Sequence, residues 1–178
     1  MIKNMFIYGS SGSGKSYLVY EILKKIEEVN GIERVGCPDF NGYYYVIRMD
    51  RSKSLRKKVG DFKHRYLAYY EYFDIVFTER KEIQKELEDI INRITHKIPM
   101  KMIIVSIKDK KGYPQWFQTF LKDNEFEEIK MEVENKEIEQ IKETVKKHLE
   151  DIVIKKMINK EEIKIINKKM QGLISINK

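Results

Sequence analysis

The sequence predicts an α/β fold around a mainly parallel central sheet. Short apolar runs alternate with helical patterns of ten or more residues, and this alternation requires the crossover connections of parallel sheets. A glycine-rich segment, residues 9–16, joins the first apolar run directly to the first helical pattern. Residues 100–109 are almost continuously apolar, which is typical of a strand covered on both faces.

The first half of the chain opens with a short strand and an amphipathic helix. We expect the strand over residues 4–8, and the helix over 16–29, where apolar residues recur at three- and four-residue spacing. Residues 32–38 and 42–49 are rich in strand-forming residues, whereas 51–58 are predicted to form a basic turn or loop.

The second half repeats the strand–helix pattern. Pro114 fits the opening of a short helix, and Asn135 is a predicted N-cap. The predicted order is strand 73–79, helix 81–97, strand 100–109, helix 114–124, outer strand 126–133 and a helix ending at about residue 150.

Length and composition favour one globular domain. The chain has 178 residues, 42% of them hydrophobic, and a net charge of +7 that permits binding to phosphate-rich partners. We assign residues 1–150 to the domain and 151–178 to an extension packed on it. Cys37 is the one cysteine, so no disulfide forms within the chain, and no apolar run is long enough to span a membrane. We therefore expect a cytoplasmic protein without a membrane partner.

The glycine-rich segment matches the phosphate-binding loop pattern G-x4-G-K-S, between a strand and a helix. Glycines let the backbone wrap around a phosphate, and the following helix presents its positive end. Lys15 is expected to bridge β- and γ-phosphate oxygens, and the Ser16 hydroxyl to ligate Mg²⁺. The predicted nucleotide-binding residues are Gly9, Ser10, Ser11, Gly12, Ser13, Gly14, Lys15, Ser16 and Tyr17.

Hydrolysis or transfer also needs a carboxylate at the end of a neighbouring strand. In "DIVFTER" we expect Glu79 to act as general base and Thr78 to take the metal-side position, where an Asp is usual. Alternatively, Glu79 simply begins the next helix. Asp50 and Asp109 are rival metal-side carboxylates, whereas Asp74 begins the predicted strand, at the end away from the ligand.

The order of these parts resembles the small nucleoside-triphosphatase family of the cancer-related nucleoside triphosphatase type. The resemblance covers residues 1–150 and includes the loop, "GCPDFNGYYYVIRMD", Val59-Gly60 and the long segment "KIPMKMIIVSIKDKKGYPQWFQTFLKDNEFEEIKMEVENKEIEQI". It implies a three-layer, RecA-like α/β/α phosphate-loop fold and slow, Mg²⁺-dependent hydrolysis of ATP, GTP and other nucleoside triphosphates. By position, Glu79 falls on the family's catalytic glutamate. Thr78 falls on its metal-side aspartate and departs from it.

Two alternative functions stay open at the level of sequence. A nucleotide or small-molecule kinase would use residues 51–58 as a lid and Asp39 near its acceptor. A nucleotide-dependent binding protein with weak hydrolysis would act on nucleic acid or a protein partner. The basic and aromatic residues of 51–58 and 62–73 suit nucleic acid.

Overall fold

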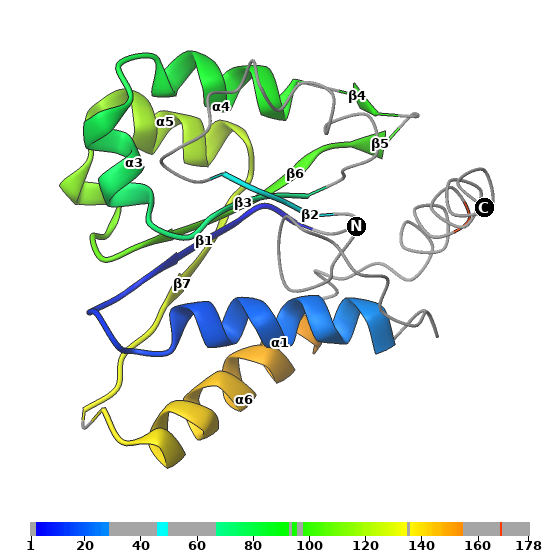
Figure 1. The fold of residues 1–178 in the computed structure, drawn as a ribbon, viewed down its shortest axis with the longest axis vertical. Helices are drawn as coiled ribbons and strands as arrows, with labels where there is room; N and C mark the ends of the chain where they lie inside the picture. Colours follow the sequence, from blue (N-terminus) through cyan, green and yellow to red (C-terminus); the bar gives the residue numbers. More distant parts are fainter. Residues whose placement is uncertain are drawn as a thin grey trace.

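The computed structural model of the chain describes residues 3–28, 46–49, 67–92, 94–95, 98–134, 136–154 and 168. Predictions for residues 32–38, 42–45, 51–58, Asn135 and most of 151–178 lie outside these ranges. The described part of the chain is an α/β fold with a parallel central sheet (Figure 1).

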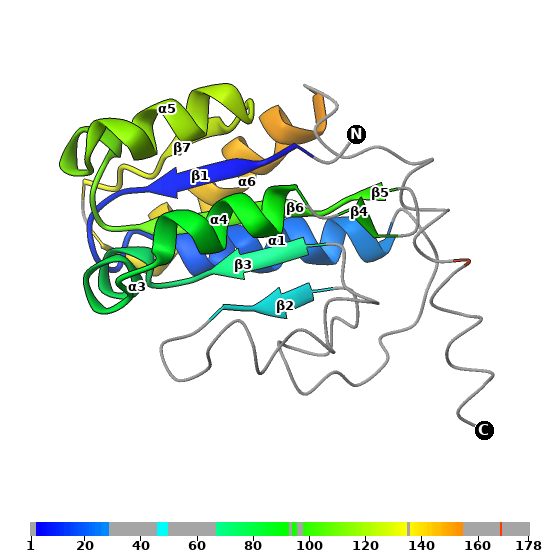
Figure 2. The ribbon, with the colours of Figure 1, turned by 90° about the horizontal axis from the view of Figure 1, so that it is seen from above.

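The central sheet has the spatial order β2-β3-β6-β1-β7, and every neighbouring pair is parallel. The arrowheads of β1, β2 and β3 therefore point to one edge of the sheet (Figure 2). The five strands are β1 Met5–Tyr8, β2 Val46–Arg48, β3 Leu67–Tyr70, β6 Lys101–Ser106 and β7 Glu127–Lys130.

Helices cover both faces of this sheet. On one face lie α1 (Lys15–Glu28) and α6 (Ile138–Ile154), and on the other lie α3 (Phe73–Glu79), α4 (Ile83–Ile91) and α5 (Gln115–Asp123) (Figures 1 and 2). The neighbours β1 and β6 are followed by α1 and α5, which lie on opposite faces. Such a switch point opens a crevice at the carboxyl ends of the strands, where ligands bind in open α/β sheets.

Alternating strand residues supply two separate cores. Met5 and Ile7 of β1 pack with α1 and α6, whereas Phe6 between them packs with α3, α4 and α5. All three side chains are fully buried. Burial on both faces explains why the inner strands have nearly continuous apolar sequences.

Aromatic rings join α3 to α5 on the second face. Phe73 and Phe117 stack with centroids 5.0 Å apart, and Phe77 stacks on Trp116 at 5.8 Å. Phe117 is fully buried and Trp116 is partly buried against the same core. This packing fixes α3 relative to the sheet.

Two small elements complete the described fold. An antiparallel hairpin pairs β4 (Ile94–Thr95) with β5 (Ile98–Pro99). The 3-10 turn η2 (Lys110–Gly112) is capped by Asp109, whose carboxylate accepts from the backbone N–H groups of Lys111 and Gly112.

Several predicted elements are confirmed. The strands at 4–8 and 100–109 correspond to β1 and β6, and the outer strand at 126–133 is β7 at the sheet edge. The helices at 16–29 and 114–124 correspond to α1 and α5. The remaining two differ in length: α4 ends at Ile91, before β4, and α6 runs to Ile154, past residue 150.

The strand predicted at 73–79 is wrong, because this segment is helix α3. A segment of seven residues with four apolar side chains, Phe73 and Ile75–Phe77, is too short for periodicity to distinguish strand from helix. Its buried Phe73 and Val76 and partly buried Phe77 follow the three- and four-residue spacing of a helix. The strand instead lies just before it, at Leu67–Tyr70.

No helix in the described ranges combines the length and apolarity needed to cross a lipid bilayer.

Candidate functional site

The glycine-rich loop turns sharply between β1 and α1. Gly9, Gly12 and Gly14 have φ angles of +152°, +76° and +88°. L-residues with side chains rarely adopt such angles, whereas glycine does so without steric cost. The loop lies at the carboxyl end of β1, beside the switch point between β1 and β6.

Two of these glycines also contact other parts of the chain too closely for a side chain. A Cβ on Gly9 would lie 2.2 Å from the carbonyl oxygen of Met131, just after β7. A Cβ on Gly14 would lie 2.5 Å from Cγ2 of Ile141 in α6. The loop is therefore packed against β7 and α6 as well as against its own strand and helix.

The start of α1 offers backbone donors to an anion. The first helical hydrogen bond runs from Leu18 N to Gly14 O at 2.9 Å. The N–H groups of Lys15, Ser16 and Tyr17 precede it and have no intrahelical acceptor. Together with the positive end of the helix dipole, they favour a negatively charged ligand at the loop.

Lys15 folds back over the loop. Its ammonium donates to the carbonyl oxygens of Gly9 at 2.8 Å and Ser10 at 2.6 Å, and the residue is only 8% exposed. Burial lowers the pKa of Lys15 below its ordinary value, Asp74 acts in the raising direction, and Lys136 lowers it further. Lys136 is exposed, and its Cδ lies 3.5 Å from a Cβ built on Gly12. Two lysines, Lys15 and Lys136, are therefore close enough to the loop to interact with a phosphate bound there.

A cavity of about 430 Å³ separates the loop from an acidic wall. Glu71 and Asp74 line it from the segment after β3, and Ser106 and Ile107 line it from the end of β6. Asp74 Oδ1 lies 3.5 Å from the backbone nitrogen of Ile107, which is long for a hydrogen bond. One cavity therefore combines a phosphate-type loop with two carboxylates.

Thr78 and Glu79 do not have the predicted positions. They lie in the last turn of α3, both exposed, and are not among the residues that line this cavity. The Thr78 hydroxyl donates to the Ile75 carbonyl at 2.9 Å, a bond within the helix. The strand-end argument for metal or base chemistry at these residues fails, because no strand ends there.

Glu71 and Asp74 take the strand-end place instead. The argument that put Asp74 at the wrong end rested on the incorrect strand at 73–79. Glu71 was missed, although "YLAYYE" is itself an apolar run followed by an acid. Asp109 is exposed and caps η2, and Asp50 lies outside the described residues.

Ser106, the last residue of β6, lines the cavity and is held in place by hydrogen bonds. Its Oγ accepts from the Lys108 backbone N–H at 2.9 Å and lies 2.6 Å from the Tyr113 hydroxyl. Burial raises the pKa of Tyr113 to about 12, so this phenol keeps its proton at neutral pH. Ser106 is buried and hydrogen-bonded, which suits a structural anchor better than a nucleophile.

The oxygen donors in this cavity suit Mg²⁺. The exposed Ser16 hydroxyl follows Lys15 at the start of α1, and the two carboxylates line the same cavity. Mg²⁺ takes oxygen ligands, usually one or two carboxylates with water and substrate phosphates. Within the described ranges there is no group of three His, Cys, Asp or Glu side chains that could hold a metal ion.

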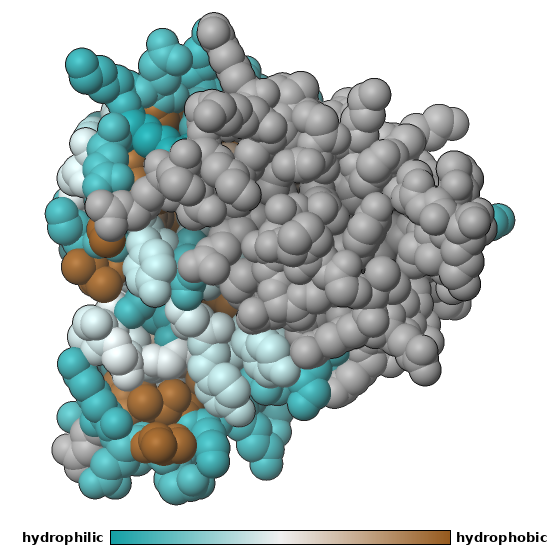
Figure 3. All heavy atoms as spheres, in the orientation of Figure 1, coloured by the Kyte–Doolittle hydropathy of each residue, from teal (hydrophilic) through white to brown (hydrophobic). Residues whose placement is uncertain are grey.

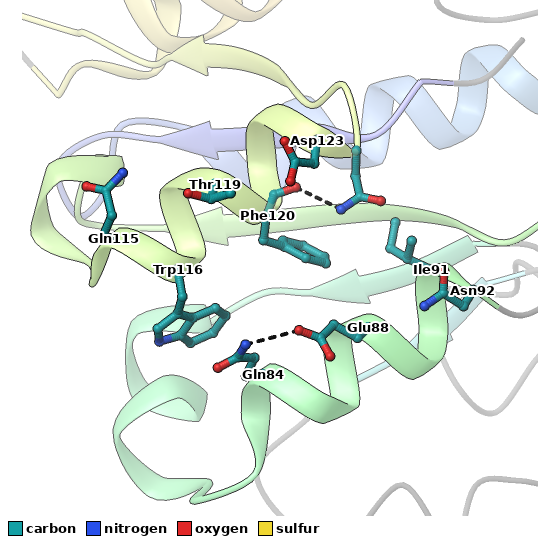
Figure 4. Close-up of a pocket in the computed structure, with 10 residues that line it drawn as sticks. Gln84, Glu88, Ile91, Asn92, Gln115, Trp116, Thr119, Phe120 and Asp123 are labelled. Carbon is teal, nitrogen blue, oxygen red and sulfur yellow. Dashed lines mark hydrogen bonds between the residues drawn. The ribbon is translucent and has the colours of Figure 1, made fainter.

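A second hollow, of about 400 Å³, lies between α4 and α5 (Figure 4). Glu88, Asp123, Trp116 and several amide side chains line it, and none of the described lining residues is a Lys or Arg. The charges on its described lining are those of Glu88 and Asp123, which disfavour a phosphate.

The mouth of the loop cavity carries exposed apolar side chains. Tyr17, Tyr72 and Ile107 are 39%, 53% and 51% exposed, and all three line the cavity. Most of the coloured surface in Figure 3 is hydrophilic, with apolar patches toward the left margin. Tyr17, Tyr72 and Ile107 therefore add apolar surface to a cavity that also holds charged side chains.

No family model, curated protein or solved structure matches this chain.

Proposed function

We propose that this chain binds a nucleoside triphosphate at residues 9–17 and hydrolyses it slowly with Mg²⁺. The proposal includes a three-layer, RecA-like arrangement and the nucleoside-triphosphatase family that the sequence resembles. The strand order is compatible with this arrangement, and it differs from the two commonest doubly wound orders, in which the first strand neighbours the second.

One observation carries the proposal: the loop and the acidic wall line the same cavity. The loop with its backbone donors and Lys15 supplies part of the lining, and Glu71 and Asp74 supply another part. A loop that bound only inorganic anions would gain nothing from two opposing carboxylates, because they repel a phosphate. A metal–phosphate complex accounts for both signs of charge.

Each residue has a distinct proposed role. The loop amides and Lys15 hold the phosphates, and Lys136 adds a second positive charge beside Gly12. Ser16 and Asp74 hold Mg²⁺, which when bound neutralises charge on the phosphates. Glu71 orients the attacking water as general base.

The first experiment measures binding of a fluorescent ATP analogue and release of phosphate from ATP. Lys15→Ala is expected to weaken binding at least about thirtyfold, as expected for losing a buried charge that holds another charge. Glu71→Gln is expected to keep binding and to lower turnover by about a hundredfold or more. The matched control is Glu79→Gln, the same change at an exposed position in the last turn of α3, which should turn over like wild type.

Three results would contradict the proposal. Loss of turnover in Glu79→Gln with normal turnover in Glu71→Gln would return the base to α3. Formation of ADP only after an acceptor is added would indicate the kinase. Unchanged binding in Lys15→Ala would remove the phosphate loop from the account.

The nucleic-acid alternative loses part of its support. Tyr69 and Tyr70, which belong to the aromatic stretch proposed for base stacking, are fully buried in β3. A buried ring has no free face for a base.

A further inference from the structure

Glu86 is a buried carboxylate that joins two other elements. It lies in α4, with its side chain 10% exposed. Its Oε1 accepts from the Tyr70 hydroxyl at 2.5 Å and from Arg80 Nη1 at 2.5 Å. Burial, followed by the nearby Glu86 carboxylate, raises the pKa of Tyr70 well above its ordinary value, so Tyr70 is the donor. The Arg80 charge and the two hydrogen bonds offset the cost of burying Glu86.

The two partners of Glu86 flank the acidic segment of the site. Tyr70 is the last residue of β3, and Arg80 directly follows α3. Residues 71–79 lie between them and include both Glu71 and Asp74. A single carboxylate oxygen therefore holds both ends of the segment that forms the acidic wall.

The helix that carries Glu86 is itself firmly packed. Ile83, Leu87 and Ile90 of α4 are buried in the core beneath it. Glu86 is therefore held at a fixed place relative to the sheet, and its hydrogen bonds fix the positions of the Tyr70 and Arg80 side chains. The phosphate loop does not depend on this link, because it is built on β1, β7, α1 and α6.

We propose that Glu86 is the positioning residue for the Glu71 and Asp74 carboxylates, an inference that rests on the proposed function. It acts through Tyr70 and Arg80, at the two ends of the acidic segment, and belongs neither to the phosphate loop nor to the residues lining the cavity. Its loss should weaken the Mg²⁺-dependent part of nucleotide binding and spare the affinity that the loop provides alone.

The test titrates a fluorescent ADP analogue first in EDTA and then with rising Mg²⁺. Glu86→Gln should need about tenfold more Mg²⁺ for half of the Mg²⁺ effect, which is the usual cost of losing support behind metal ligands. Its affinity in EDTA should equal that of wild type. Tyr70→Phe keeps the ion pair and loses one hydrogen bond, so a shift of about fivefold in the same direction is expected.

Glu88→Gln is the matched control. Glu88 is exposed on the same helix and accepts from Gln84 at 3.1 Å, on the side of the α4–α5 hollow (Figure 4). This variant should match wild type in both titrations.

The outcomes separate this inference from the proposed function. Wild-type Mg²⁺ dependence in a folded Glu86→Gln, with only a lower unfolding temperature, would make Glu86 merely structural and overturn the inference. If Glu86→Gln does not fold, an unshifted Mg²⁺ dependence in Tyr70→Phe overturns it equally. If the wild-type protein binds no nucleotide in the first titration, the proposed function itself is contradicted, and the inference about Glu86 with it.

Discussion

Gly9 and Gly12 differ in how much room surrounds them, although both have positive φ angles. A Cβ on Gly12 would meet only the flexible end of Lys136 at 3.5 Å, whereas a Cβ on Gly9 would overlap the Met131 carbonyl oxygen at 2.2 Å. The first position carries backbone strain alone, and the second adds a clash with backbone.

We therefore predict that Gly9→Ala is much more destabilising than Gly12→Ala. Strain at Gly12 should cost about 1–2 kcal/mol, or a fall in Tm of about 2–8 °C for a chain of this length. The Tm of Gly9→Ala should fall further than that of Gly12→Ala, because β7 must move away from the loop. This variant should also lose nucleotide binding. Thermal unfolding of both variants checks this, and equal Tm values would contradict the packing of β7 on the loop.

The lowered pKa of Lys15 predicts a pH dependence of nucleotide binding. Only the protonated ammonium attracts phosphate, so affinity should fall as the pH rises through a pKa below the ordinary 10.5. Because Lys136 lowers that pKa, Lys136→Ala should move the alkaline fall to higher pH, besides weakening binding at neutral pH.

Lys146→Ala, at an exposed position of α6, is the control for this experiment. It removes the same charge from a residue that is not among those shifting the pKa of Lys15, which are Asp74 and Lys136. Fluorescent nucleotide titrations from pH 7 upward measure the effect. Superimposable profiles for wild type and Lys136→Ala would show that the two lysines do not interact.

At the scale of elements, Asn4 connects the amino-terminal ends of several strands. Its Oδ1 accepts from Met102 N in β6 at 2.9 Å, and its Nδ2 donates to the Asn124 carbonyl at 2.9 Å. Its own carbonyl accepts from Glu127 N of β7 at 2.9 Å. Asn4 lies just before β1 and is buried.

Asn4→Ala should therefore lower the free energy of unfolding by about 1–3 kcal/mol, because it leaves two polar backbone groups without partners. Urea unfolding measures this loss. Asn4→Asp keeps the acceptor for Met102 N and should lose less at a pH where the carboxyl is protonated. An Asn4→Ala midpoint equal to that of wild type would show that water replaces the side chain.

The elements that the sequence predicted well are those with a long or unambiguous pattern. The fourteen residues of α1 and the continuous apolar run of β6 were both recognisable from the sequence. Helix α3 was not, because a seven-residue segment with only four apolar side chains fits a strand equally well. The strand β3 was missed because its two tyrosines lie in a basic and aromatic stretch, which is typical of an exposed binding surface.

The position of the carboxyl end of β3 decided how much of the site could be predicted from the sequence. The loop residues follow a local motif, so their positions could be predicted from sequence alone. The acidic wall depends on where β3 ends, and a shift of that end exchanged Thr78 and Glu79 for Glu71 and Asp74. Lys136 reaches the loop only through the packing of α6 on α1, which no local pattern shows.

At the scale of the whole molecule, the site is assembled from both faces of the sheet. The loop leads into α1 on one face, and the acidic wall leads into α3 on the other. A ligand in the cavity therefore contacts elements that pack on both cores, and it should stabilise the complete domain. The net charge of +7 also favours the approach of a polyanion such as a nucleoside triphosphate.

Calorimetry with a non-hydrolysable ATP analogue and Mg²⁺ tests the central claim most directly, with the unfolding temperature recorded in the same samples. We predict saturable binding by wild type and, at a hundred times Kd, a rise in Tm of about 5–10 °C. Lys15→Ala, with binding weakened at least about thirtyfold, should show at the same ligand concentration a rise in Tm of about a third of this or less. A wild-type protein that gives no binding heat and no shift in Tm with ATP or GTP analogues would contradict the account.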